Sequence, residues 1–407
     1  MHIGHFHGAL KNWVRMQDEH PCFFFVADWH ALTTHYEDTS SVAENTLQVA
    51  TDWLSVGLDP AKSTLFIQSS VPEHAELHVL LSMITPLSWL ERVPTYKEQI
   101  ENLKDRDLGT YGFLGYPLLQ SADIVIYDAD FVPVGEDQVP HVEITREIVR
   151  RFNTHFGLSA ERLFNDPDAA LRVARKLKSL VHLSEEDFPS GVVIEGSEFN
   201  ARLRATIEMV IRREVAESGA ENFFEKLGSD RKLFRQTAVL HEPGHLLTET
   251  PRLPGTDGRR MAKSYGNAIW LSDPPDEIRN KVRNMMTDPQ RQRRTDPGRP
   301  EVCPVFAWHK LFSSLDTVTQ IDHECRTAAI GCVQCKGQMA ENLVKWIEPV
   351  QARRKELEAR PKEVWDILDA GSKKAQKAAR RTMKRVRNAI FKWDEAREDS
   401  PKAAGAP

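Results

Sequence analysis

Long apolar runs are missing from this sequence, and we expect no signal peptide. No run reaches the ~18 consecutive apolar residues that a membrane-spanning helix needs. The N-terminus has no charged region followed by an apolar one, as a signal peptide would have. We therefore expect a cytoplasmic protein that does not contact a membrane. In that reducing compartment, five cysteines in 407 residues argue against a disulfide framework and for a metal site if they group.

An excess of positive charge is also missing. The formal net charge of -5 excludes a globally basic nucleic-acid-binding protein, but it leaves room for a local basic patch. One stretch without acidic residues predicts such a patch for a polyanion, with an ordinary solvated helix face as the alternative. Its basic residues are Lys373, Lys374, Lys377, Arg380, Arg381, Lys384, Arg385 and Arg387.

Short apolar runs alternate with helical patterns in the first part of the chain. We predict buried strands at Cys22–Ala27, Thr64–Gln68, Ile124–Tyr127 and Phe131–Val134, and a helix from about Ser41 to Val56. This alternation predicts an α/β fold with a doubly wound parallel sheet. Such sheets bind ligands at the carboxyl ends of their strands.

The first residues form a pattern suited to phosphate binding. His2-Ile3-Gly4-His5 opens a helical pattern that runs to about Met16. A helix N-terminus carries partial positive charge, and two histidines one turn apart can donate hydrogen bonds to phosphate oxygens. Gly4 would let a base or sugar approach the backbone. A structural or metal-binding His-x-x-His remains the alternative reading.

Two further segments carry candidate ligand-binding carboxylates. Asp123 lies between apolar segments, where it could accept a hydrogen bond from a ligand N–H or simply cap a helix. Gly135-Glu136-Asp137-Gln138 directly follows a predicted strand, as in sites where a backbone approaches a nucleoside and a carboxylate binds ribose. The same pattern also occurs in ordinary strand-to-helix turns.

A glycine-bracketed loop lies at residues 254–264. It contains Arg259 and then Arg260-Met261-Ala262-Lys263-Ser264. Mobile cations of this kind can close over a triphosphate and stabilise the charge that develops on its leaving group. A solvated basic loop is the alternative.

Four of the five cysteines group in one region. They are Cys303, Cys325, Cys332 and Cys335. Four thiolates predict a tetrahedral metal or iron–sulfur site, and their spacing does not decide between zinc and iron. Cys22 lies in a predicted core strand and is not expected to take part.

Taken together, these motifs resemble one family. His2–His5 resembles the HIGH motif of class I aminoacyl-tRNA synthetases, and Arg260–Ser264 is similar to their KMSKS loop. The segments Tyr116–Asp123 and Val134–Gln138, with the helix carrying His141, Glu143 and Arg146, closely resemble tryptophanyl-tRNA synthetases. The four grouped cysteines resemble those of members that carry a 4Fe-4S cluster near the anticodon-binding region.

The resemblance implies a Rossmann-like catalytic core followed by an α-helical domain. It implies that L-tryptophan is activated with ATP and Mg²⁺ and is then transferred to tRNA(Trp). His2, His5, Arg260 and Lys263 would be catalytic, and Asp123, Tyr116 and Gln138 would bind tryptophan. ATP would be held by Gly4, His5, Gly135, Glu136, Asp137, Arg260, Met261, Ala262, Lys263 and Ser264. The resemblance further implies a 4Fe-4S cluster, or zinc, and a homodimer.

This sequence departs from the family pattern in two places. The loop has Arg260 and Ala262 where the family usually has lysine and serine, so one hydroxyl is lost. The family's first strand and its Pro-Ser/Thr-Gly turn do not precede His2, and we expect the genomic sequence upstream of Met1 to encode them. A non-catalytic RNA-binding or redox-sensing paralogue, a tyrosyl-specific relative and a simple nucleotidylyltransferase are the competing hypotheses.

We predict five segments along the chain. One of them, a helical insertion at 158–235, contains no chemical motif and is interrupted by an apolar segment at 188–196. The segments are a catalytic core at 1–157, this insertion at 158–235, a core continuation with the loop at 236–270, a helical anticodon-binding domain with the cysteines at 271–397, and a disordered tail at 398–407.

Overall fold

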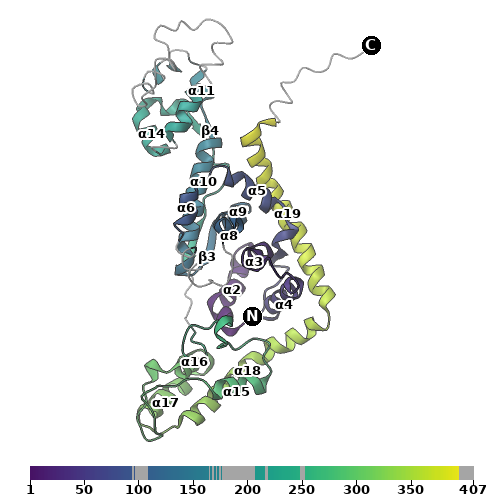
Figure 1. Cartoon of the computed structure of the whole chain (residues 1–407), viewed down its shortest axis with the longest axis vertical. Helices are drawn as coiled ribbons and strands as arrows, with labels where there is room; N and C mark the ends of the chain where they lie inside the picture. Colours follow the sequence, from purple (N-terminus) through teal and green to yellow (C-terminus); the bar gives the residue numbers. More distant parts are fainter. Residues whose placement is uncertain are drawn as a thin grey trace. The chain divides into compact units, whose positions relative to one another are not determined.

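The computed structural model divides the chain into two compact units. It describes residues 1–93, 96, 109–164, 166, 169–170, 172–173, 176, 207–215, 219–247 and 253–393 (Figure 1). Unit 1 comprises Met1–Val71, Pro133–Asp137 and Leu246–Gln376, and unit 2 comprises Pro72–Val132, Gln138–His245 and Lys377–Pro407. The predicted apolar segment at 188–196 and the predicted tail lie outside the described residues.

Helices dominate both units, and the strands are short. Unit 1 contains α1 (Ile3–His5), the π-helical turn η1 (Phe6–Leu10), α2 (Lys11–Glu19), β1 (Cys22–Val26), α3 (Asp28–His35), α4 (Val42–Ser55), β2 (Ser63–Ile67), η2 (Gln68–Ser70), η5 (Lys263–Tyr265), α15 (Pro275–Arg283), η6 (Pro300–Val302), α16 (Pro304–Phe312), α17 (Leu315–Arg326) and α18 (Cys332–Glu358). Unit 2 contains α5 (Glu73–Ser82), α6 (Leu87–Glu91), α8 (Tyr111–Leu114), α9 (Tyr116–Val125), α10 (Val139–Phe156), β4 (Leu158–Ser159), α11 (Glu161–Phe164), α14 (Ala220–Leu227), η4 (Gly228–Leu233) and β5 (Arg235–Gln236). The remaining elements are β3 (Phe131–Val134), η3 (Glu136–Gln138), β6 (Gly244–Leu247) and α19 (Pro361–Phe391).

The α/β core of unit 1 is built on a parallel strand pair. β1 and β2 pair in register from Cys22 opposite Ser63 to Val26 opposite Ile67. The helix α4 lies between them in the chain, which gives the β-α-β order that a parallel pair requires. The apolar side chains of β1 and β2 pack into one core with Leu10 and Trp53. The predicted strands near 22–27 and 64–68 and the helix near 41–56 are thereby confirmed, as is the α/β fold class.

One predicted strand is wrong. The segment expected as a strand at 124–127 belongs to α9 up to Val125 and then forms a turn. Pro117 stands in the first turn of this helix, where proline is well tolerated. A short apolar run is compatible with either a buried strand or a buried helix, and the sequence alone did not distinguish them. The strand predicted at 131–134 is confirmed as β3, which pairs with β6.

A separate apolar core lies between β4 and β5 in the sequence. These two strands pair antiparallel, with Leu158 opposite Gln236 and Ser159 opposite Arg235. Buried side chains between Ala160 and Phe234 form their own cluster, which includes Phe223 and Leu227. This part of unit 2 therefore has its own source of hydrophobic stabilisation.

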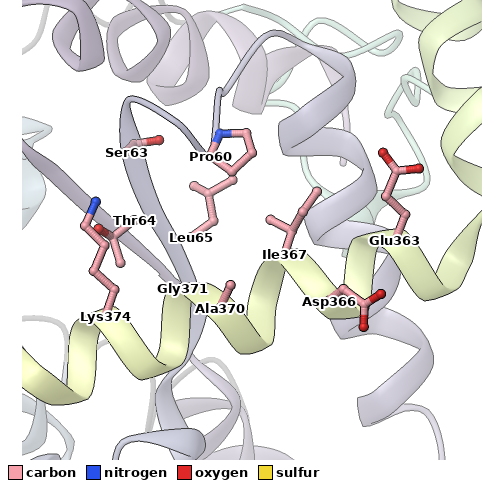
Figure 2. Close-up of a pocket in the computed structure, with 10 residues that line it drawn as sticks. All are labelled: Pro60, Ser63, Thr64, Leu65, Glu363, Asp366, Ile367, Ala370, Gly371 and Lys374. Carbon is pink, nitrogen blue, oxygen red and sulfur yellow. The ribbon is translucent and has the colours of Figure 1, made fainter.

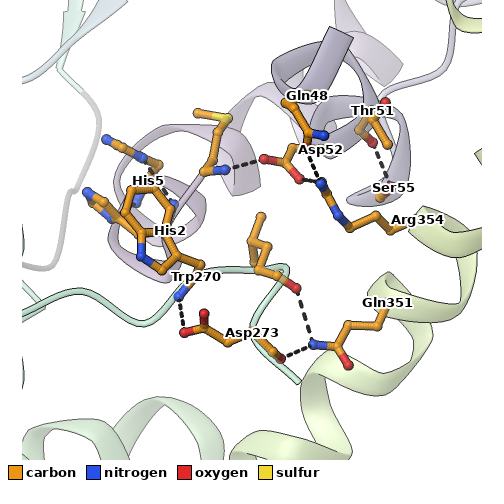
Figure 3. A network of polar contacts seen from close by, with 12 residues as sticks. His2, His5, Gln48, Thr51, Asp52, Ser55, Trp270, Asp273, Gln351 and Arg354 are labelled. Carbon is orange, nitrogen blue, oxygen red and sulfur yellow. Dashed lines mark hydrogen bonds and ion pairs between the residues drawn. The ribbon is translucent and has the colours of Figure 1, made fainter. Parts of the chain in front are cut away.

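The helical part of unit 1 packs around Trp308. This side chain is fully buried, and its indole Nε1–H donates to the Pro254 carbonyl oxygen at 2.9 Å. Near the C-terminal end of α18, the buried Arg354 guanidinium forms an ion pair with Asp52 of α4 (Figure 3). The helical region and the α/β core of unit 1 are thus joined by both apolar packing and a buried charge pair.

Gly371 marks a close contact between α19 and β2. A Cβ atom added at Gly371 would lie 1.8 Å from the Leu65 carbonyl oxygen. The next residue, Ser372, accepts a hydrogen bond from the Ile67 N–H with its side-chain oxygen at 3.4 Å. Only glycine therefore lets this helix lie against the edge of the strand.

We expect Gly371→Ala to destabilise unit 1. Because the clash is with backbone, the helix must move, and the free energy of unfolding should fall by about 1–3 kcal/mol. Gly337→Ala is the matched control, since Gly337 is exposed within α18 and an added Cβ there meets nothing within 4 Å. That variant should be unchanged or up to about 1 kcal/mol more stable. Urea unfolding would measure both, and an unchanged Gly371→Ala midpoint would contradict this packing.

Candidate active site

The two histidines at the N-terminus form a reciprocal hydrogen-bonded pair. The His5 backbone N–H donates to His2 Nδ1 at 3.2 Å, and the His2 backbone N–H donates to His5 Nδ1 at 3.3 Å. Their rings stack with centroids 3.5 Å apart (Figure 3). Each Nδ1 is therefore an acceptor, which leaves the proton of a neutral imidazole on Nε2.

Both imidazoles are neutral at physiological pH. The pKa of His2 is lowered to about 4, mainly by burial and then by the positive N-terminal ammonium group. The pKa of His5 is also lowered to about 4, mainly by burial and then by His2. Arg260 contributes to both shifts. Two neutral Nε2–H donors side by side can bind phosphate oxygens without changing their own protonation.

The structure brings this turn together with the loop at 260–264. The Ile3 N–H donates to the Ile269 carbonyl oxygen at 3.0 Å, so the two segments run alongside each other. A Cβ atom at Gly4 would lie 3.0 Å from the His2 ring and 3.3 Å from the Met261 sulfur. Gly4 therefore allows the two segments to approach, a role in addition to the one predicted from the sequence.

Asn267 organises the loop, and sequence reasoning did not single it out. Its side-chain oxygen accepts a hydrogen bond from the Ala262 N–H at 2.9 Å. Its Nδ2 donates to Asp257 Oδ1 at 2.7 Å and to the Arg260 carbonyl oxygen at 3.1 Å. Asn267 is buried and follows Gly266, whose backbone is left-handed. The only sequence signal was an asparagine after a glycine, which is common in turns.

The cations of the loop differ in their partners. Arg259 pairs with Asp257 and stacks on the Tyr265 ring at 4.5 Å. Arg260 and Lys263 are exposed, and neither forms an ion pair with the part of the chain that the structure describes. These two side chains are thus available to a bound polyanion, whereas Arg259 is already engaged.

The predicted nucleoside-binding segment also belongs to unit 1. Gly135 follows β3, and a Cβ atom there would lie 2.9 Å from Asp137 Oδ1. Glu136 and Asp137 are exposed on the short helix η3. Glycine at this position therefore gives the Asp137 carboxylate the space it occupies.

The residues predicted to bind tryptophan belong to unit 2. Tyr116 and Asp123 are seven residues apart on α9, which places them on the same side of the helix. Asp123 is buried, and its Oδ1 lies 2.5 Å from His74 Nδ1. Gln138 is the residue that precedes α10, and the ring of Tyr116 lies 5.6 Å from that of His141. The residues predicted to bind ATP therefore belong to unit 1, and the residues predicted to bind tryptophan belong to unit 2.

Three of the four grouped cysteines share one apolar neighbourhood in unit 1. Cys303, Cys325 and Cys335 pack against the cluster of Phe306, Ile321 and Ile330. The pKa of Cys335 is raised to about 12, mainly by burial and then by Cys303, Cys325 and Cys332. Arg291 NH1 lies 3.7 Å from Cys325 Sγ.

In the part of the chain that the structure describes, these thiols are not arranged as a set of metal ligands. Among the described residues, no three His, Cys, Asp or Glu side chains are grouped so as to hold a metal ion. The donor set itself suits a thiolate-bound centre, because four half-buried sulfurs come from nearby segments with a guanidinium beside one of them. Cys22 is buried in β1, within the separate core of the α/β region, as expected.

Comparison with known proteins identifies the family. The model of the family described as tRNA synthetases class I (W and Y) matches residues 1–180 and 213–348. A tryptophan--tRNA ligase of Ralstonia nicotianae is 48% identical over 96% of this chain and 95% of its own length. The corresponding protein of Thermotoga maritima is 41% identical over 96% and 95%. The chain belongs to the tryptophanyl-tRNA synthetases, a family of class I aminoacyl-tRNA ligases.

Solved structures agree with this assignment. A tryptophanyl-tRNA synthetase of Campylobacter jejuni, solved in complex with ADP and tryptophan, has a TM-score of 0.69 and 26% identity over 96% of both chains. The class I synthetase fold, with a Rossmann-like core and a helical region, is therefore that of this chain. The departure at Arg260 and Ala262 does not remove the chain from the family.

The basic stretch of this synthetase is only partly available to a polyanion. It lies on α19, and three of its arginines pair with carboxylates of unit 2: Arg380 with Glu73, Arg385 with Asp128 and Arg387 with Glu76. The interpretation of the whole stretch as a free patch is therefore too broad. The other basic residues are exposed, namely Lys373, Lys374, Lys377, Arg381 and Lys384.

Unit 1 of this synthetase also contains a pocket of about 350 Å³. It is found in unit 1 between β2 and the first part of α19, next to the contact at Gly371 (Figure 2). Its polar lining includes Thr64, Asp366 and Lys374. None of the residues predicted to bind ATP, tryptophan or a metal lines it. Within the described part of the chain, no helix is long and apolar enough to span a bilayer.

Proposed function

We propose that this synthetase joins tryptophan to tRNA(Trp) in two steps. The tryptophan carboxylate attacks the α-phosphate of ATP, which forms tryptophanyl-adenylate and pyrophosphate. The tryptophanyl group is then transferred to the 3′ end of the tRNA. The observation that carries the proposal is the approach of the His2–His5 turn to the Arg260–Ser264 loop, supported by relatives named for this reaction.

Catalysis of the first step requires no protein nucleophile, because the substrates supply both reacting groups. The protein positions them and stabilises charge. The Nε2–H groups of His2 and His5 would bind phosphate oxygens, and Lys263 and Arg260 would neutralise the departing pyrophosphate. Mg²⁺, bound with ATP, would neutralise further phosphate charge.

The other ATP-binding roles follow the same motifs. Gly4 would lie beneath the nucleotide, and Gly135, Glu136 and Asp137 would bind the nucleoside. The backbone of Met261, Ala262 and Ser264 would complete the phosphate site. In unit 2, Asp123 would accept the indole N–H, while Tyr116 and Gln138 would bind the α-amino group.

An amino-acid-dependent exchange of pyrophosphate into ATP tests this proposal directly. We expect exchange with tryptophan and none with tyrosine. Exchange with tyrosine would instead support a tyrosyl-specific enzyme. If no amino acid supports exchange, the proposed function is contradicted and a non-catalytic paralogue is favoured.

We propose that the helical region binds the anticodon end of the tRNA. The exposed basic residues of α19 would contact its phosphates, because such contacts supply much of the affinity for nucleic acid. The five segments with boundaries after 157, 235, 270 and 397 are proposed as the domain division. We further propose a cytoplasmic homodimer, and sedimentation of the purified protein would measure its oligomeric state.

We propose a 4Fe-4S cluster held by Cys303, Cys325, Cys332 and Cys335. The apolar neighbourhood shared by three of the thiols, and the influence of Cys332 on Cys335, support the site, and the choice of iron–sulfur over zinc rests on the family resemblance. When bound, the cluster would link the start of α18 to the segments around Cys303 and Cys325. Its contribution would be to hold the helical region together.

Cys332→Ser should lose the cluster and reduce tRNA charging more than adenylate formation. The reason is that the four cysteines would hold the helical region together, and none of them is assigned to ATP. Anaerobic purification with absorption spectra and assays of iron, sulfide and zinc would measure the loss. Cys22→Ala, which changes a cysteine in β1, should retain the iron. A colourless wild-type protein with one zinc would overturn the iron–sulfur assignment.

A further inference from the structure

Asp123 belongs to a buried hydrogen-bonded chain in unit 2. His74 of α5 lies between Asp123 of α9 and Tyr127 in the turn that follows α9. Its Nδ1 is 2.5 Å from Asp123 Oδ1, and its Nε2 is 2.6 Å from the Tyr127 hydroxyl oxygen. His74 is completely buried, and Asp123 is 3% exposed. No sequence motif suggested that these three residues act together.

With an ionised Asp123 and a neutral His74, the chemistry of the three groups determines the direction of the hydrogen bonds. An ionised carboxylate only accepts, so the bond to Asp123 requires a proton on His74 Nδ1. A neutral imidazole then has an unprotonated Nε2, which accepts from the Tyr127 hydroxyl. The pKa of Tyr127 is raised, mainly by burial and then by the charges of Asp123 and Glu73. The tyrosine therefore keeps its proton and remains a donor at physiological pH.

We infer that His74 and Tyr127 are positioning residues that set the specificity of this synthetase for tryptophan. They hold the Asp123 carboxylate in one orientation and keep it ionised, so that it accepts the indole N–H. This inference rests on the proposed function, because it gives Asp123 the role assigned there. It adds His74 of α5 and Tyr127 of the turn after α9 to the residues that determine recognition of tryptophan.

The physical reason for such a chain is the cost of burying a carboxylate. A buried carboxylate without donors takes up a proton, and a protonated one presents a hydroxyl that no longer selects an N–H. A neutral histidine supplies one strong donor without adding a positive charge that would compete with the substrate. The Tyr127 hydroxyl prevents the imidazole ring from rotating, because a ring flip would break both hydrogen bonds.

The experiment compares tryptophan with benzothienylalanine, in which sulfur replaces the indole N–H. Tryptophan-dependent pyrophosphate exchange is measured for the wild type and for Tyr127→Phe, His74→Leu and His74→Asn. We expect Tyr127→Phe to raise KM for tryptophan about two- to tenfold and His74→Leu to raise it about tenfold or more. Neither should change KM for ATP or KM for the analogue, so the preference for tryptophan falls.

Two variants separate positioning from general packing. In His74→Asn, the amide can still donate to Asp123 from near the Nδ1 position, and we expect it to recover part of the preference that His74→Leu loses. Ser121→Ala is the matched control. Ser121 is buried on the same helix and bonds to Pro117 and Thr145, so its loss should lower stability without changing the preference.

A spectroscopic measurement is independent of activity. Nitrogen-15 NMR of the wild type should show a neutral His74 with a protonated Nδ1 and an unprotonated Nε2. An imidazolium, or a proton on Nε2, would overturn the inference. An unchanged preference in both Tyr127→Phe and His74→Leu would overturn it as well. If His74→Leu does not fold, Tyr127→Phe decides. A wild type without tryptophan-dependent exchange would instead contradict the proposed function, while the NMR result would still report the hydrogen-bonded chain.

Discussion

Lys263→Ala should lower the rate of adenylate formation about 10²- to 10³-fold, with little change in tryptophan binding. Lys263 is exposed and forms no ion pair with the described residues, so its charge is available to the phosphates. Pyrophosphate charge develops mainly in the transition state, and a cation there raises kcat more than it tightens the ground state. Single-turnover adenylate formation and equilibrium tryptophan binding would measure the two effects separately.

Arg259→Ala is the matched control for this loop. Its guanidinium already pairs with Asp257 and stacks on Tyr265, both at the surface, so its contribution should be no more than about 1 kcal/mol. A free-energy difference of about 1 kcal/mol corresponds to about a fivefold change in rate, so we expect a smaller change than that. If Lys263→Ala weakens tryptophan binding as much as it slows the reaction, the loop is a docking surface and not part of the catalytic machinery.

Asp123→Asn should reduce kcat/KM for tryptophan about 10- to 150-fold and leave KM for ATP nearly unchanged. The substitution preserves shape but removes a buried charge that accepts hydrogen bonds. The loss of one charge-assisted hydrogen bond costs about 1.5–3 kcal/mol, which corresponds to that range. Steady-state pyrophosphate exchange at varied tryptophan and varied ATP would provide both constants. Unchanged tryptophan kinetics would refute the assignment of Asp123.

Asp230→Asn controls for the general effect of removing a buried carboxylate in the same unit. Asp230 is 6% exposed and pairs with Lys176 at 2.6 Å, far in sequence from the residues assigned to tryptophan. Its substitution should lower the thermal midpoint without altering either KM. A loss of tryptophan affinity in this variant would show that the insertion and the tryptophan site are coupled.

The sequence alone was sufficient for the elements that have a local cause. The apolar runs at β1, β2 and β3 are flanked by turn residues and polar ends, and they form strands as predicted. Ser41 directly precedes α4, where the helix was expected to begin. The motifs His2–His5 and Arg260–Ser264 led to the family before any geometry was known, because their chemistry requires particular residues at particular spacings.

Only the tertiary structure decided the features that depend on distant partners. The segment at 124–127 is short and apolar, and packing of α9 against α5 and α10 made its first two residues helical and placed the others in a turn. Asp123 meets His74 from 49 positions away, and three basic residues of α19 meet carboxylates of α5 and the segment after α9. Asn267 became recognisable only when its three hydrogen bonds within the loop were seen.

The physical reason for this division is the range of the forces involved. Strand and helix patterns, caps and motif spacing arise from interactions between neighbours in the chain, which a sequence displays directly. Burial, buried ion pairs and side-chain hydrogen bonds depend on which surfaces meet after folding. The sequence therefore determined the family and the candidate residues of this synthetase, whereas the fold determined the neutral form of His2 and His5, the close approach at Gly4 and the partners of Asp123.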